Sequence, residues 1–260
     1  MKGFAELFAA TRGDDGVWTF ELMERFNGAF GGTNGGTLTA LSVYVARQIS
    51  ARQPTSIDSR YLRSFRPGLA RVVPSVLNEG RTLSVVGIDI VDENDNVCCH
   101  STVTLVDPAA LATSLEHPAI EPPPALAAAQ DQRPWVAPAA QAIPLIATYR
   151  PTQLARNGAA TVTGIDIPWG EPGTSAEAAC IAADMSVGPP VARIVRSSAS
   201  TPNPDLSLRF CATLDEVTRP YASCNVERVA GGLATTRISV WSEQQLLAVG
   251  ISTTTCIPLR

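Results

Sequence analysis

The sequence predicts an α+β protein made of two tandem copies of one unit, each with a long antiparallel sheet and a central helix. Two observations predict this class. Similar strand segments occur in the two halves of the chain, and one apolar helical segment precedes each run of strands. With 45% hydrophobic and 17% charged residues, the chain also has enough apolar side chains for a buried core.

The internal repeat lies in Gly80–Glu93 (GRTLSVVGIDIVDE) and Ala230–Glu243 (AGGLATTRISVWSE). At a constant offset the segments share apolar positions and a closing glutamate: Leu83 with Leu233, Ile88 with Ile238, Ile90 with Val240, and Glu93 with Glu243. Each segment alternates as a strand does, and a second strand follows it, at Val97–Val106 or Leu246–Cys256. Both pairs therefore predict β-hairpins.

Further strand candidates lie upstream of each hairpin at matching places. They are Ser56–Phe65 and Leu69–Asn78 in the first half, and Asp205–Ala212 and Tyr221–Val229 in the second. Pro74 interrupts one of them, and because proline has no N–H to donate, we expect a bulge or an edge position there.

A helix is predicted before each run of strands. The first spans Gly35–Ser50, with Leu38, Leu41, Val45 and Ile49 on one face. The second spans Thr174–Val187, and we expect Gly188-Pro189-Pro190 to stop it. Small or apolar residues surround most of both segments, which is typical of buried helices.

The two units are separated by a stretch rich in proline and alanine, within 107–138. We expect an N-terminal unit over residues 1–115, a linker over 116–138 and a C-terminal unit over 139–260. Two such units in one chain are expected to pack as an internal pseudo-dimer.

Composition argues against several classes of function. A net charge of −4 does not favour a nucleic-acid partner, and no apolar run reaches the roughly 18 residues of a membrane helix. The cysteines form no C-x-x-C pair, and the neighbours Cys98 and Cys99 point to opposite faces of a strand. We therefore expect no metal, no membrane association and a cytoplasmic location.

A local basic cluster is open to two interpretations, solvated strand ends or a phosphate-binding patch: Arg60, Arg63, Arg66 and Arg71.

Several short motifs, taken in order, resemble the bacterial type II acyl-CoA thioesterases. They are Phe30-Gly31-Gly32 before a helix, Tyr61–Gly68 (YLRSFRPG), Gly80–Leu83 (GRTL), Ala182-Ala183-Asp184, Asp205–Leu208 (DLSL) and Trp241-Ser242-Glu243. The resemblance implies a double-hotdog fold, in which each sheet wraps a helix, and a homo-oligomer of two or more chains. It also implies hydrolysis of acyl-CoA to free acid and coenzyme A, without a cofactor, a metal or a Ser-His-Asp nucleophile.

The resemblance implies that an Asp of the second half activates water, assisted by a Thr and a Gln. It places Asp205 in the first role, although an Asp beside proline is also common in turns. Glu227 then stands where the family has Thr, and Ser252 where it has Gln. A register shifted by one residue would bring Thr253 or Arg228 into play instead.

A glycine-rich segment directly precedes the first helix. Within it, Gly32, Thr33, Asn34 and Gly35 are candidate substrate-binding residues, because free N–H groups at a helix start favour negative charge and glycine permits close approach. A tight loop with an Asn or Thr cap is the structural alternative. Asp184, on the second helix, is expected to face inward, either as a functional group or as a hydrogen-bonded core residue.

The sequence bears on two other functions. Asp95 and His100 have the spacing of a hydratase motif but lie on a turn and a strand, so that match is attributed to chance. A non-catalytic protein that binds acyl-CoA or lipid stays open, because the predicted site departs from the family at Glu227 and Ser252.

Overall fold

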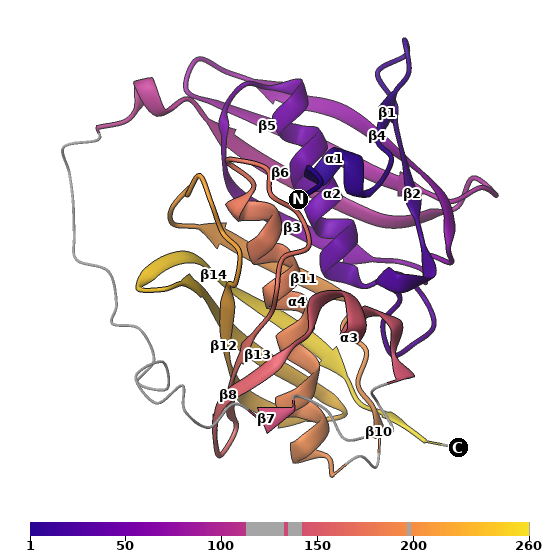
Figure 1. Ribbon diagram of the computed structural model, residues 1–260, viewed down its shortest axis with the longest axis vertical. Helices are drawn as coiled ribbons and strands as arrows, with labels where there is room; N and C mark the ends of the chain where they lie inside the picture. Colours follow the sequence, from indigo (N-terminus) through magenta and orange to yellow (C-terminus); the bar gives the residue numbers. More distant parts are fainter. Residues whose placement is uncertain (113–132, 135–141, 197–198, 260) are drawn as a thin grey trace.

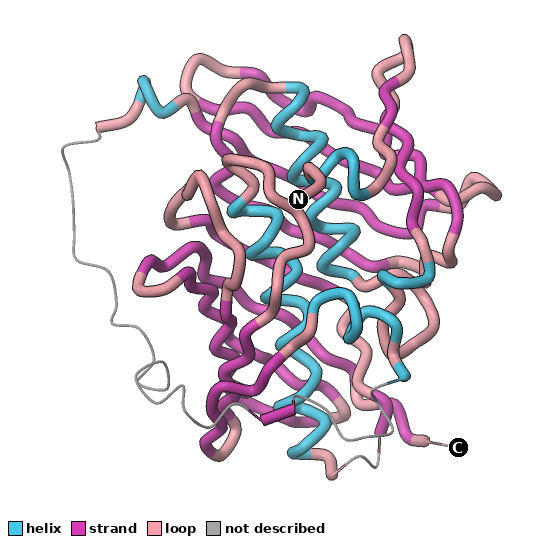
Figure 2. The backbone as a smooth tube through the Cα atoms, in the orientation of Figure 1, coloured by secondary structure: helices cyan, strands magenta, loops and turns pink. Residues whose placement is uncertain are grey.

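The computed structural model describes residues 1–112, 133–134, 142–196 and 199–259. One antiparallel sheet of 13 strands wraps two long helices, α2 (Gly35–Ile49) and α4 (Ser175–Ile194), as Figure 1 shows. The tube in Figure 2 shows the two helices inside the curved strands. This arrangement confirms the predicted double-hotdog, α+β fold.

The first unit surrounds α2. Its short helices are α1 (Phe4–Leu7), η1 (Glu24–Phe26) and η2 (Pro108–Ala110). Its strands are β1 (Thr11–Arg12), β2 (Trp18–Leu22), β3 (Gln53–Tyr61), β4 (Gly68–Glu79), β5 (Leu83–Val91) and β6 (Val97–Val106). They lie in the order β1-β2-β4-β5-β6-β3.

The second unit repeats the plan around α4. Its strands are β7 (Arg133–Pro134), β8 (Thr152–Asn157), β9 (Ala160–Gly164), β11 (Asp205–Phe210), β12 (Tyr221–Ala230), β13 (Leu233–Ser242) and β14 (Gln245–Thr255). They continue the sheet in the order β11-β14-β13-β12-β9-β8-β7. The short helix α3 (Pro144–Tyr149) precedes β8, and β10 (Ala199–Ser200) pairs separately with β15 (Ile257–Pro258).

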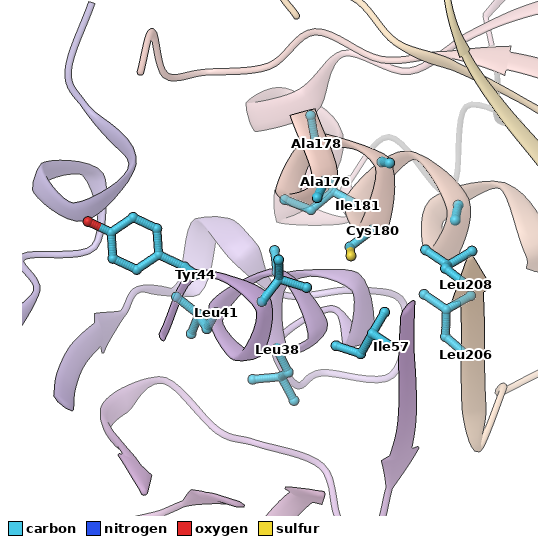
Figure 3. Packing of buried hydrophobic residues seen from close by; sticks show 14 of the residues in the cluster. Leu38, Leu41, Tyr44, Ile57, Ala176, Ala178, Cys180, Ile181, Leu206 and Leu208 are labelled. Carbon is cyan, nitrogen blue, oxygen red and sulfur yellow. The ribbon is translucent and has the colours of Figure 1, made fainter. Parts of the chain in front are cut away.

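The two units join along one strand pair. β3 and β11 are antiparallel neighbours, with Ile57 opposite Leu208 and Arg60 opposite Asp205. Beneath this joint α2 packs on α4, closely enough that a Cβ on Gly36 would lie 2.9 Å from the Ile181 Cα. Apolar side chains of both units form one core there, as Figure 3 shows for Leu41, Ile181 and Leu206.

The internal repeat extends to irregularities of the strands. β4 shifts register between Val76 and Asn78, and β12 shifts between Val226 and Arg228. Each following hairpin has a second shift, near Val91 in one and Trp241 in the other. The two predicted hairpins are thus confirmed, and the bulges that bend them are repeated as well.

Pro74 lies where only one side of β4 is paired. β2 pairs with β4 as far as Val72, whereas Pro74 faces Ile88 of β5 alone. Its missing N–H therefore costs no ladder bond on the open side. The predicted edge position is confirmed.

The end predicted for the second helix is wrong. α4 continues through Gly188, Pro189 and Pro190 as far as Ile194. The prolines remove the N–H groups that would bond to the Met185 and Ser186 carbonyls. The continued helix, however, buries Val191 completely against Val226 and Ala234 of the sheet, and this packing compensates for the lost bonds.

The helix predicted from Gly35 is confirmed, and the strands match their predicted segments within a few residues. Most of the expected linker, 116–138, lies outside the described residues, so the unit boundaries stay a prediction. In the described part of the chain, no helix combines the length and apolar character that a membrane span needs.

Candidate active site

The candidate site centres on Asp184, in the middle of α4. The surrounding helix is almost wholly buried, and Asp184 itself is 7% exposed. Two side-chain amides hold its carboxylate: Asn203 Nδ2 donates to Oδ1 at 2.7 Å, and Asn34 Nδ2 donates to Oδ2 at 2.6 Å. Three segments distant in sequence thus meet at one carboxylate.

Asn34 has two roles at the start of α2. It is the N-cap, and its Oδ1 accepts a hydrogen bond from the Thr37 N–H at 3.2 Å. Because its oxygen caps the helix, its Nδ2 is free to face Asp184. The cap therefore also positions the carboxylate beside the positive end of the α2 dipole.

Burial raises the pKa of Asp184 above the ordinary value for an aspartate. The amides of Asn203 and Asn34, together with the backbone N–H of Gly36, oppose this rise because they stabilise the charged form. A carboxylate with a raised pKa, held in one orientation by donors, is suited to accept a proton.

Two glycines allow the close contacts around this carboxylate. A Cβ on Gly35 would lie 2.5 Å from the Tyr61 ring, and a Cβ on Gly36 would lie 2.7 Å from the Asp184 Cβ. The phenol of Tyr61 is 2.8 Å from Thr39 Oγ1, which in turn donates to Ser59. Burial, and next the charge of Asp184, raise the Tyr61 pKa well above its ordinary value, so this ring is a neutral wall of the site.

A cavity of about 900 Å³ opens beside Asp184. Its apolar wall includes Leu38, Leu62, Leu145, Met185, Pro189 and Ala192. Its polar wall includes Asn34, Asn203 and three arginines: Arg63, Arg156 and Arg193. The volume and the mixed lining suit a small organic ligand with a long apolar part.

The four residues predicted to bind substrate, Gly32, Thr33, Asn34 and Gly35, all line this cavity. Gly32 allows a tight loop, because a Cβ there would lie 2.0 Å from Ser64 Oγ. The Thr33 hydroxyl is buried and has no hydrogen-bond partner among the described residues. Their contact with a substrate stays a prediction.

Asp205 and Ser252 lie close to each other but do not line the cavity. Asp205 Oδ1 accepts a hydrogen bond from the Thr253 N–H at 2.7 Å, and the Ser252 hydroxyl donates to the Asp205 carbonyl oxygen at 2.7 Å. These bonds fasten the start of β11 to β14. Asn203, two residues earlier, is the side chain that reaches Asp184.

Glu227 is placed elsewhere, on the exposed surface of β12. Its carboxylate accepts from Arg237 Nε at 2.7 Å, and bonds from Asn225 and Arg237 lower its pKa. Glu227 falls at the register shift between Val226 and Arg228. A bulge changes which face a residue occupies, so counting along the hairpin does not determine where this side chain points, and its catalytic role stays a prediction.

The sequence marks Asp184 as a candidate but gives no sign of Asn203. The signal for Asp184 is a lone carboxylate in the buried helical run CIAADMSV, because a buried charge requires partners. No local pattern marks Asn203, since its contact with Asp184 depends on how the loop before β11 crosses α4.

Comparisons with known proteins also relate this chain to acyl-CoA thioesterases. Residues 24–106 match the sequence profile of the acyl-CoA thioesterase N-terminal domain. No curated protein matches the chain.

Solved structures share the fold over nearly the whole chain. A candidate thioesterase from Novosphingobium aromaticivorans is 17% identical over 95% of this chain and 98% of its own, with a TM-score of 0.77. A hot dog fold protein of unknown function from Alicyclobacillus acidocaldarius is 15% identical over 96% of both chains, with a TM-score of 0.73. Acyl-CoA thioesterase II TesB2 from Mycobacterium marinum is 12% identical over 96% of both, with a TM-score of 0.72. The N-terminal profile and the shared fold together confirm the resemblance of this chain to the type II acyl-CoA thioesterases.

Proposed function

We propose that the protein hydrolyses acyl-CoA thioesters and that Asp184 activates the attacking water. The single observation that carries this proposal is the Asp184 carboxylate, held by Asn34 and Asn203 on the wall of a cavity at the amino end of α2. The similarity of the N-terminal half to an acyl-CoA thioesterase domain supports the choice of substrate.

In the proposed reaction, Asp184 accepts a proton from water as the oxygen attacks the thioester carbonyl carbon. Negative charge then develops on the carbonyl oxygen, and the amino end of α2, with its N–H group at Gly35, stabilises it. When the C–S bond breaks, the Asp184 carboxyl returns the proton to the leaving thiolate. The products are the free acid and coenzyme A.

The test compares two aspartates in thiol release from a panel of acyl-CoAs. Asp184→Asn is expected to lower kcat/KM by about 10²–10⁴-fold, because it removes the base. Asp205→Asn is the matched variant, since its side-chain oxygen can still accept from the Thr253 N–H. A large loss in Asp205→Asn, with activity kept in Asp184→Asn, would reverse the assignment.

The same panel separates hydrolysis from binding alone. Wild-type protein that binds acyl-CoA saturably but releases no thiol above background would reject the enzyme. That result would favour a non-catalytic acyl-CoA-binding protein.

A further inference from the structure

The cavity has an apolar stretch that leads away from Asp184 along one face of α4. Met185, Pro189 and Ala192 line it, followed by Arg193. At about 1.5 Å per residue, Arg193 lies roughly 13 Å along the helix axis from Asp184. The apolar stretch suits methylene groups, which make no hydrogen bonds.

The far end of this stretch is polar. Thr161 of β9 lines the cavity there and is 2% exposed, and its hydroxyl has no hydrogen-bond partner among the described residues. Its direct cross-strand partner is Arg156 of β8, so the two side chains share one face of the sheet. A buried hydroxyl without a partner is costly, so a ligand group at this position would satisfy it.

Arg193 closes the same end from the helix. Its Nη2 donates to the carbonyl oxygens of Gly158 and Ala160, in the turn between β8 and β9. The guanidinium is thereby fixed, and its other N–H groups have no hydrogen-bond partner among the described residues. Thr161, Arg156 and Arg193 thus converge from two strands and a helix.

The charge at this end is not balanced within the described residues. Asp184 is the single acidic side chain among those that line the cavity, and it lies at the other end of the apolar stretch. Neither Arg156 nor Arg193 takes part in an ion pair within the described part of the chain. Two arginines beside a buried hydroxyl are suited to an anionic group with several acceptor oxygens.

We infer, on the basis of the proposed function, that the preferred substrates are ω-carboxyacyl thioesters, whose terminal carboxylate binds Arg156, Arg193 and the Thr161 hydroxyl. The thioester then lies at Asp184 and the methylene chain crosses the apolar stretch between them. The same arginines would also suit the phosphates of coenzyme A, so the experiment separates the two sources of negative charge.

The experiment measures kcat/KM for suberoyl-CoA and octanoyl-CoA, which have equal chain lengths and differ in the terminal carboxylate. Wild-type protein is expected to favour suberoyl-CoA. Arg156→Ala is expected to lower that preference about tenfold or more, and Thr161→Val by a few fold. Arg81→Ala, an exposed arginine outside the cavity wall, is the matched control.

Repeating the measurement with the same acyl groups on pantetheine, which carries no phosphate, decides between the sources. A preference that persists and still depends on Arg156 supports the inference. Equal loss with both acyl-CoAs, absent with the pantetheine thioesters, assigns the arginines to coenzyme A and overturns it.

Failure of the proposed function gives a different result. If wild-type protein releases thiol from neither substrate, calorimetric binding of the two acyl-CoAs tests the subsite independently. Tighter binding of suberoyl-CoA, lost in Arg156→Ala, supports the subsite, and equal binding rejects it.

Discussion

The two central helices begin in contrasting surroundings, although they belong to repeated units. The start of α2 opens on the cavity, and its cap residue Asn34 faces Asp184 of the other helix. At the start of α4, the Thr174 hydroxyl accepts from Trp169 and donates to the Glu171 carbonyl oxygen. One helix start therefore forms a polar site, while the other is packed into the protein.

An aromatic side chain of the N-terminal segment, Phe4, helps to cover the start of α4. The Phe4 ring of α1 stacks on the Tyr44 ring and meets the Trp169 ring edge-on, with 4.9 Å between the ring centroids in both pairs. Its backbone N–H also donates to Glu171 at 2.7 Å. The comparison teaches that a repeated fold specifies where a site can form, whereas a few local side chains decide whether it stays open.

The largest effect on stability is expected at the start of α4, which is packed into the protein. Arg47→Met would leave Glu177, which is wholly buried in α4, without its ionic partner at 2.7 Å. We expect a loss of about 3–5 kcal/mol in the free energy of unfolding at neutral pH, measured by urea denaturation.

This loss should depend on pH in one direction. Burial already raises the pKa of Glu177, and removal of Arg47 raises it further. When the folded-state pKa of a carboxyl group lies above its unfolded-state value, stability is lost as pH rises through the folded-state pKa. The deficit should therefore shrink in acid, and adding Glu177→Gln should recover part of it. A deficit independent of pH would contradict the charge explanation.

A smaller effect on stability is expected at the start of α2, which opens on the cavity. Gly36→Ala would place a methyl group 2.7 Å from the Asp184 Cβ and 2.8 Å from the Cys180 carbonyl oxygen. Overpacking of this kind costs about 1–3 kcal/mol, which denaturation can measure. Gly188→Ala in α4 is the control, because its Cβ would meet nothing within 4 Å apart from its chain neighbours, and it should cost less than Gly36→Ala. Equal stability of the two variants would refute the contact.

The smallest effect on stability concerns the cap. Asn34→Ala removes the bond to the Thr37 N–H and should cost about 1 kcal/mol. It also removes a donor to Asp184, so the pKa of that carboxyl should rise further.

Because the base acts in its charged form, the acid limb of the pH–rate profile should move to higher pH in Asn34→Ala. Asn203→Ala removes the other donor without touching a helix cap, and should give the same shift at a smaller cost in stability. Unchanged profiles in both variants would show that Asp184 does not control the rate.

Local patterns predicted the repeated elements well. Alternating apolar residues located the hairpins, and the glycine-rich segment located the start of α2 at Gly35. The continuation of α4 past Pro189 was not predictable locally, because it depends on the sheet residues that bury Val191.

The site was only partly predictable for the same reason. Gly32–Gly35 and Asp184 were identified as candidates, but their meeting joins positions 150 residues apart in sequence. Glu227 lies at a bulge on the exposed surface, and Asp205 bonds to the Thr253 N–H and does not line the cavity, so their catalytic roles stay predictions. The pairing between the two units determines such contacts, and neither segment's own sequence predicts that pairing.

The pairing of β3 with β11 has a consequence for how the chain folds. Either unit without the other would present an open strand edge, at β3 or at β11, available for association with other molecules. It would also expose the face of its helix that now packs on the other unit. The pairing of the two units therefore covers, in each, a strand edge that would otherwise be open to association.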